Sequence, residues 1–163
     1  MPRFPDWHHS DELIAILDAL PDQRLNRALH DLLWQYAGEN SDAAQREALL
    51  ALLQHPRYRG LQNLHHWIGD VLHGGTPWTT LLPHIEAQLG HLHHESCATF
   101  GDQAGMSDDT DALEAAVARL FAEGSDNAHS IIWSILYWHK ALAVRRPAWD
   151  AWLRQRIAAL HRE

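Results

Sequence analysis

The sequence predicts an all-α fold, a compact single-domain helical bundle, and three observations carry this prediction. Leucine and alanine dominate the apolar residues, with 24 and 23 copies in 163 residues. Both lose little side-chain freedom in a helix, whereas the β-branched residues that favour strands are sparse, with only three valines. Helix-start and helix-stop residues also recur along the whole chain. We therefore expect one domain over 1–163 that contains about seven to eight helices.

Capping residues and leucine spacing predict the helices in order. They are expected over 10–20, 22–37, 42–53, 61–73, 77–98, 108–123 and 126–144, with a last helix from 147 onward. Asp42 and Gln45 form the pattern of a capping box at the start of the third helix. Gly124 is placed to end the sixth helix, Ser125 or Asp126 to begin the seventh, and Pro147 to open the last.

Three segments have predicted roles in the architecture. The helix over 126–144 is apolar on nearly all sides, so we expect it to be central, with amphipathic helices packed around it. Residues 99–107 contain two glycines among polar neighbours and are predicted to be a flexible loop. Residues 1–9 are expected to form an extended N-terminal arm.

Composition narrows the class of protein. The formal charge is −8, and the acidic balance argues against general nucleic-acid binding, which needs many phosphate contacts. Residues 140–163 are the exception, with six basic and two acidic residues, a balance that a solvated helix face would explain. No apolar stretch is long enough to span a membrane, and no secretory signal is visible. With Cys97 as its only cysteine, the chain is expected to be cytoplasmic.

Histidine is the first unusual feature, with 14 copies. On the predicted helix over 77–98, His84, His91 and Glu95 lie within one stripe at about 100° per residue. The stripe borders the apolar face of that helix, so its side chains would be half-buried. Imidazoles and carboxylates ligate zinc and non-haem iron, which makes these three residues candidate metal ligands.

The helix predicted over 61–73 adds His66 and His73 as further candidate ligands. These two histidines lie opposite the apolar face of their helix, so an ordinary polar surface is the competing interpretation. A pH-sensitive or partner-binding surface is a third interpretation. The sequence contains no HExxH and no CxxC motif that would favour the metal site.

Tryptophan is the second unusual feature, with eight copies. Trp133 and Trp138 are expected in the core, because their predicted helix is apolar on most sides. Other aromatic residues fit the core pattern less well, and exposed tryptophan, tyrosine and arginine dominate protein–protein interfaces. The candidate partner-binding residues are Trp7, Arg57, Tyr58, Arg59, Trp67 and Trp78.

These observations favour a binding protein without catalysis. No motif for a catalytic nucleophile, a phosphate loop or a dinucleotide site is present. A small acidic helical protein of bacterial type is typical of inhibitors, immunity proteins and adaptors, and its acidic surface would attract a basic partner. The alternative is a metal-binding helical bundle that uses the helices over 61–73 and 77–98.

Overall fold

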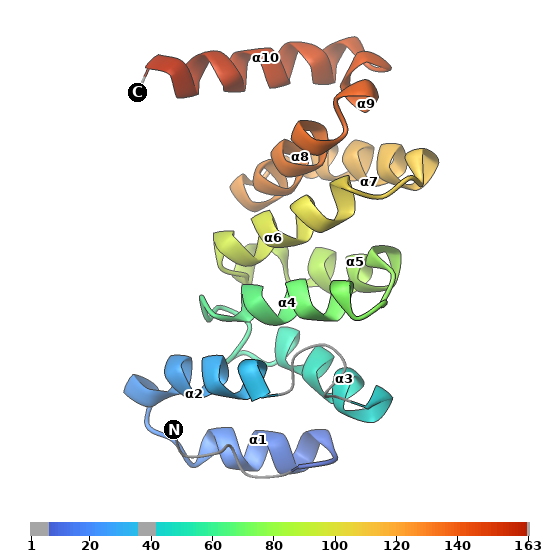
Figure 1. The fold of residues 1–163 in the computed structure, drawn as a ribbon. Coiled ribbons are helices and arrows are strands. Elements are labelled where there is room, and N and C mark those ends of the chain that lie inside the picture. The colour runs from blue at the N-terminus through green and yellow to red at the C-terminus, as the bar shows by residue number, and fades with distance from the viewer. Residues whose placement is uncertain (1–6, 36–41, 163) are drawn as a thin grey trace. The chain divides into compact units, whose positions relative to one another are not determined.

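The computed structural model describes residues 7–35 and 42–162, and all regular structure in these residues is helical. This confirms the all-α prediction. The described residues form ten α-helices, more than the sequence predicts, because two of the expected helices are divided (Figure 1). The contacts divide the chain into a first unit, Met1–Phe100, and a second unit, Gly101–Glu163. That both units belong to one compact domain stays a prediction.

The first unit contains α1 to α5 and most of α6. The helices are α1 (Ser10–Asp18), α2 (Asp22–Gln35), α3 (Ala43–Leu50), α4 (Leu64–His73), α5 (Trp78–Ala87) and α6 (His94–Gly105), with 3-10 turns η2 (Ala51–Leu53) and η3 (Leu89–His91). Helix α1 packs against α3 and α2 packs against α4, so alternate helices lie side by side (Figure 1). The described buried residues of α1 and α2 are leucines, as the spacing in the sequence predicts, whereas α4 buries Leu64, Trp67, Ile68 and Val71.

The capping box before α3 is confirmed. The backbone N–H of Gln45 donates to Asp42 Oδ1 at 2.8 Å, and the backbone N–H of Asp42 donates to Gln45 Oε1 at 3.1 Å. The amide of Gln45 also donates to the backbone oxygen of Trp7 at 2.8 Å. This side chain therefore both starts a helix and fixes the segment that precedes α1. Residues 1–6 of the predicted arm and the predicted end of the second helix lie outside the described residues.

The predicted helix over 77–98 is divided into α5, η3 and the start of α6. The chain leaves the helical conformation at Gln88, and Leu92 has an extended backbone at φ −80° and ψ 147°. Gly90 lies in this break, and glycine is a poor helix former. Leu89 and Leu92 nevertheless bury their side chains, so the break keeps the apolar residues in the core.

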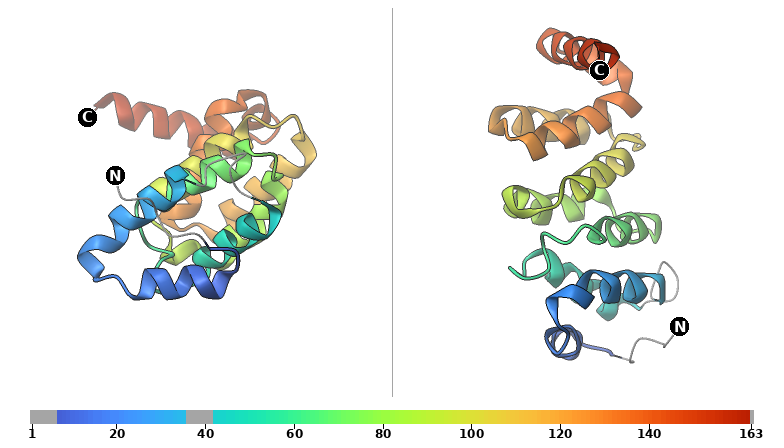
Figure 2. Two further views of the ribbon diagram at one scale, coloured as in Figure 1. Left: turned by 60° about the horizontal axis from the view of Figure 1, so that its bottom comes forward. Right: turned by 90° about the vertical axis from the view of Figure 1, so that its left-hand side faces the viewer.

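The second unit continues with α7 (Thr110–Glu123), α8 (Asp126–Trp138), α9 (Lys140–Val144) and α10 (Pro147–Arg162). Helices α7 and α8 pack against each other and stay side by side in the turned views (Figure 2). Gly124 ends α7 at φ 76°, and the Ser125 hydroxyl accepts from Ala128 N to cap α8, as predicted. Pro147 opens α10, also as predicted.

The flexible loop predicted over 99–107 is wrong for residues 99–105, which form the last turns of α6. A methyl group on Gly101 would lie 2.8 Å from Ile131 O, and one on Gly105 would lie 3.0 Å from Trp138 Cβ. The two glycines therefore allow α6 to lie directly against the backbone of α8. These glycines serve a close contact between two helices and not a turn.

A continuous helix over 126–144 is not observed, because the chain leaves the helical conformation at His139 (φ −119°, ψ 63°). Neither glycine nor proline stands at this break. Helix α8 is also not enclosed on all sides, because Tyr137 and Trp138 are half-exposed. Its central position in the whole chain stays a prediction. Within the described ranges, no helix has the length and apolar character needed to cross a membrane.

Candidate functional site

Four of the candidate partner-binding residues are buried, so the prediction that they present exposed rings is wrong. Trp7 and Tyr58 are 0% exposed, Trp67 is 1% exposed and Trp78 is 8% exposed. Trp67 lies on the buried side of α4, and Trp78 packs edge-to-face on Phe100 with ring centroids 6.4 Å apart. These side chains build the core of the first unit.

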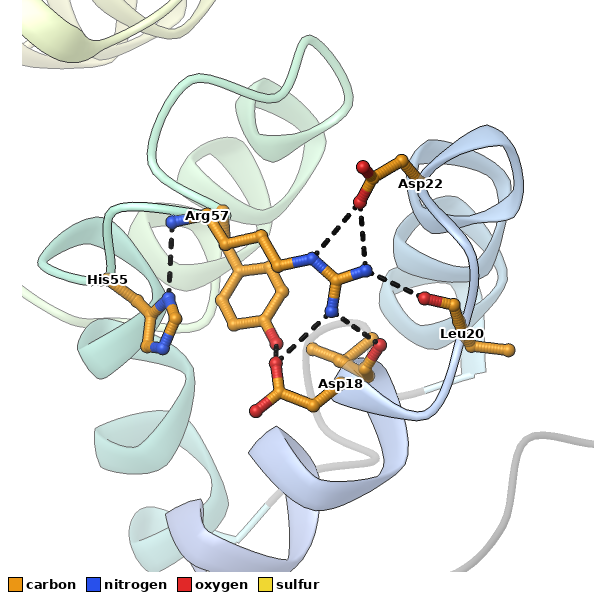
Figure 3. A network of polar contacts seen from close by, with 7 residues as sticks. Asp18, Leu20, Asp22, His55 and Arg57 are labelled. Atoms are coloured by element: carbon orange, nitrogen blue, oxygen red, sulfur yellow. Dashed lines mark hydrogen bonds and ion pairs between the residues drawn. The ribbon is translucent and has the colours of Figure 1, made fainter.

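The described side-chain hydrogen bonds of Arg57 all lie within the first unit (Figure 3). Its guanidinium donates to Leu17 O in the last turn of α1 at 3.2 Å and to Leu20 O in the turn that follows at 2.7 Å. It also forms ion pairs with Asp18 at 3.2 Å and Asp22 at 3.0 Å. The segment over 55–60 is thereby attached to the turn between α1 and α2. This is the role of an internal clamp, because every donor group meets an acceptor from the same chain.

Tyr58 and Arg59 complete this clamp. The buried hydroxyl of Tyr58 donates to Asp18, and burial together with this carboxylate raises the pKa of Tyr58 to about 12. The same hydrogen bond, assisted by Arg57, lowers the pKa of Asp18. Arg59 donates to Gln88 Oε1 at 2.7 Å. All three consecutive side chains are therefore used in holding the fold.

The predicted metal stripe on the fifth helix does not form, because that helix is divided between its members. His84 stays on α5, where its Nδ1 lies 2.9 Å from the amide of Gln54. His91 is exposed in η3, and Glu95 stands in the first turn of α6. Glu95 accepts from the amide of Gln62, which is the main reason that its pKa is lowered.

The histidines of α4 pair with other groups than those the sequence suggests. His65 Nδ1 lies 3.4 Å from Glu95 Oε2, and the ring of His65 is tilted against that of His66 with centroids 4.0 Å apart. His66 also contacts the ring of His30 at 5.7 Å, while His73 stands in the last turn of α4. Over the described ranges, no three histidine, cysteine or carboxylate side chains come close enough to hold one metal ion. The five candidate ligands are therefore not brought together.

Cys97 is a core residue of α6 in this structure. It is fully buried, and burial raises the pKa of its thiol to about 12. A thiol with such a pKa holds almost no thiolate at neutral pH, and the thiolate is the nucleophilic form. The geometry thus gives Cys97 the role of a small apolar side chain.

The described exposed large apolar side chains all belong to the second unit. They are Met106, Tyr137, Trp138, Val144, Ile157 and Leu160. Tyr137 and Trp138 lie where the end of α8 meets the end of α6, and Met106 directly follows the last residue of α6. Trp133, half-buried one turn earlier on α8, extends the group. We call Met106, Trp133, Tyr137 and Trp138 the aromatic surface.

The rings of the aromatic surface are ordered by specific contacts. Tyr137 lies edge-to-face on Trp138 with centroids 5.8 Å apart, and Trp133 is 5.9 Å from Tyr137. Lys140 Nζ lies over the Tyr137 ring at 5.7 Å. The indole N–H of Trp138 donates to Asp102 Oδ1 at 3.0 Å. Trp138 is thus held in one orientation although 51% of the residue is exposed.

The expectation that Trp138 lies in the core is wrong, and the sequence pattern does not predict the aromatic surface. The signal that could have found it is the run from Ile135 to Trp138, four consecutive apolar residues that cover a full helix turn. A single contact face can bury only about half of such a turn. No pattern in the sequence indicates that Asp102 reaches the indole.

Comparisons of this chain with models of protein families, with curated proteins and with solved structures give no match.

Proposed function

We propose that this chain is a protein-binding module without catalysis and that the aromatic surface is its binding site. The observation that carries the proposal is the half-exposed ring of Trp138, which a hydrogen bond to Asp102 fixes in place. Tryptophan, tyrosine and methionine are the residues enriched in protein interfaces, and tryptophan and tyrosine dominate their hot spots. A ring that is already ordered also loses little conformational freedom when a partner binds.

The charged groups of the first unit support a binding role more than a catalytic one. The described carboxylates of this unit with lowered pKa values are Glu12, Asp18 and Glu95, and they accept from His8 N–H, Tyr58 and Gln62 in contacts within the chain. The buried Cys97 lacks the character of an activated nucleophile. An inhibitor, an immunity-type protein or an adaptor, acting in a reducing compartment on a basic partner, is the function that we propose.

A photo-crosslinking experiment in the producing cell tests this proposal. A benzophenone amino acid replaces Tyr137 in one variant and Gln23, an exposed residue of α2, in the control. We expect a discrete protein adduct at position 137 and none at position 23. The adduct should disappear when Trp138→Ala is added. It should only weaken when Asp102→Ala is added, because this change keeps the Trp138 ring and removes the hydrogen bond that orients it.

Circular dichroism of each variant shows whether the fold is kept, which is expected since Trp138 is half-exposed. The proposal is wrong if position 137 gives no adduct, or if Trp138→Ala leaves a discrete adduct unchanged in a folded variant. Equal adducts at positions 137 and 23 would also contradict it, because they would show a surface without preference.

A further inference from the structure

Helix α10 is held at its beginning and exposed at its end. Trp149 and Leu153 are the buried residues of this helix. Trp152 contacts the ring of Phe121 at 6.5 Å and that of His129 at 5.6 Å, which holds the first turns against α7 and α8. Every residue over 154–162 is exposed, and these turns extend past α7 and α8 (Figures 1 and 2).

The apolar stripe of α10 continues into this exposed part. Trp149, Leu153, Ile157 and Leu160 share one face at about 100° per residue. The first two are 5% and 7% exposed, whereas Ile157 is 38% exposed and Leu160 is 50% exposed. The same face of one helix is therefore covered over its first half and uncovered over its second half.

The charges along the uncovered stripe are mostly basic, although Glu163 follows the helix. Residues 151–162 contain Arg154, Arg156 and Arg162 and no aspartate or glutamate. Arg156 lies beside Leu160 on the helix surface by the same spacing, and Arg154 lies beyond Ile157 on the other side. The nearest acid of the helix is Asp150, one turn earlier, which pairs with Arg154 at 2.9 Å. The uncovered half thus presents two aliphatic side chains between arginines.

We propose that the exposed half of α10 binds an acidic amphipathic helix of a partner protein. An aliphatic stripe would cover Ile157 and Leu160, and carboxylates on its flanks would meet Arg154 and Arg156, as flanking charges do in coiled coils. This adds a second surface to the protein-binding function proposed above. Because it involves none of the residues of the aromatic surface, it can fail while that proposal stands.

Charge and packing favour this occupant over two others. A second copy of α10 would bring the arginines of both copies together, and like charges across an interface are destabilising. A lipid surface would need a longer apolar face, whereas Trp149 and Trp152 are already held within the second unit. A helix of about two turns in contact matches the length of stripe that is available.

Two synthetic peptides test the proposal on the full chain. Each has about three heptads with leucine at a and d, and one carries glutamate and the other lysine at e and g. Fluorescence anisotropy of the labelled peptides gives the dissociation constants at several salt concentrations. We expect the glutamate peptide to bind at least about tenfold more tightly than the lysine peptide, with an affinity that falls as salt rises.

Matched variants locate the peptide on the helix. Ile157→Asp with Leu160→Asp should raise the dissociation constant about tenfold or more. Ala151→Asp with Ala158→Asp adds the same charge to the opposite, exposed face of α10 and should have a smaller effect. Both pairs change exposed residues, and circular dichroism checks that the fold is kept.

Arg156→Glu should reduce the preference for the glutamate peptide, whereas Arg24→Glu on α2 makes the same charge change elsewhere and should not. The proposal is overturned if both peptides bind equally, if neither binds, or if the two aspartate pairs have the same effect. It is also overturned if the chain is a dimer that Ile157→Asp with Leu160→Asp dissociates. If the chain sediments with anionic vesicles, and Ile157→Asp with Leu160→Asp abolishes this binding, a membrane-binding role replaces the proposal.

Discussion

Gly101→Ala should destabilise the second unit although alanine is the better helix former. Gly101 lies within α6, where alanine is favoured over glycine by about 1 kcal/mol. The new methyl group would lie 2.8 Å from Ile131 O and 2.8 Å from Ser134 Cβ. Atoms of the α8 backbone cannot rotate away, so relief requires a shift of the whole helix.

Gly69→Ala is the matched control, since Gly69 lies within α4. Its methyl group would meet Thr99 Cγ2 at 3.6 Å, an ordinary van der Waals distance. The substitution should therefore stabilise the first unit by about 0.5–1 kcal/mol, which is the helix-propensity gain alone. The two substitutions are chemically identical and differ only in the space that the neighbouring element leaves.

The expected magnitude follows from two opposing terms. Overpacking typically costs about 1–3 kcal/mol, and contact with a rigid backbone places Gly101→Ala at the upper end. After the helix-propensity gain is subtracted, the net loss in the free energy of unfolding is about 1–2 kcal/mol. For a chain of this length, that corresponds to a melting temperature lower by about 2–8 °C.

Urea titration followed by far-UV circular dichroism measures both variants. If the two units unfold in separate transitions, each substitution should move only the transition of its own unit. A Gly101→Ala variant that is as stable as the unmodified chain, or more stable, would refute the reasoning. It would show that Gly101 does not mark a close contact between α6 and α8.

Two further predictions concern groups whose pKa is raised by burial. Cys97, with a pKa raised to about 12, should react with a thiol reagent in native buffer far more slowly than in denaturant, and fast native labelling would contradict its burial. The pKa of Tyr58, about 12, lies above its ordinary value of 10.0, so its stabilising effect is complete below pH 10 and is lost as pH rises toward 12. Tyr58→Phe removes the hydrogen bond to Asp18 and should destabilise the chain at neutral pH, and the difference should shrink in alkaline urea titrations as Tyr58 ionises. A difference that does not change with pH would exclude a contribution from Tyr58 ionisation.

Local signals predicted the helix boundaries that depend on neighbouring residues alone. The capping box of Asp42 and Gln45, the cap at Ser125 and the left-handed Gly124 are all formed as expected. Each of these uses groups within three or four residues of one another. A short window of sequence therefore determines the geometry of these caps, and no tertiary contact is needed to produce it.

Features that depend on another helix were not predictable in the same way. Gly101 and Gly105 stand in a stretch whose composition is typical of a loop, yet in the structure they allow α8 to lie close to α6. Arg57 and Tyr58 are residue types that are common in protein interfaces. The groups that accept their hydrogen bonds nevertheless lie about 40 residues earlier in the chain, at the end of α1. Arginine and tyrosine satisfy a buried turn and a partner surface equally well. Composition therefore could not separate the two roles.

The aromatic surface shows what the periodicity of apolar residues can and cannot predict about their burial. Four consecutive apolar residues, Ile135 to Trp138, occupy all sides of one helix turn, so only an enclosed helix could bury them all. The structure buries Ile135 and Leu136 and leaves Tyr137 and Trp138 half-exposed. This difference in burial follows the chemistry of the side chains. Isoleucine and leucine have no polar side-chain atom, whereas tyrosine and tryptophan can keep their polar atoms hydrogen-bonded at the boundary with solvent. Trp138 does so through Asp102, and this fixed, half-exposed ring is the feature on which the proposed binding role rests.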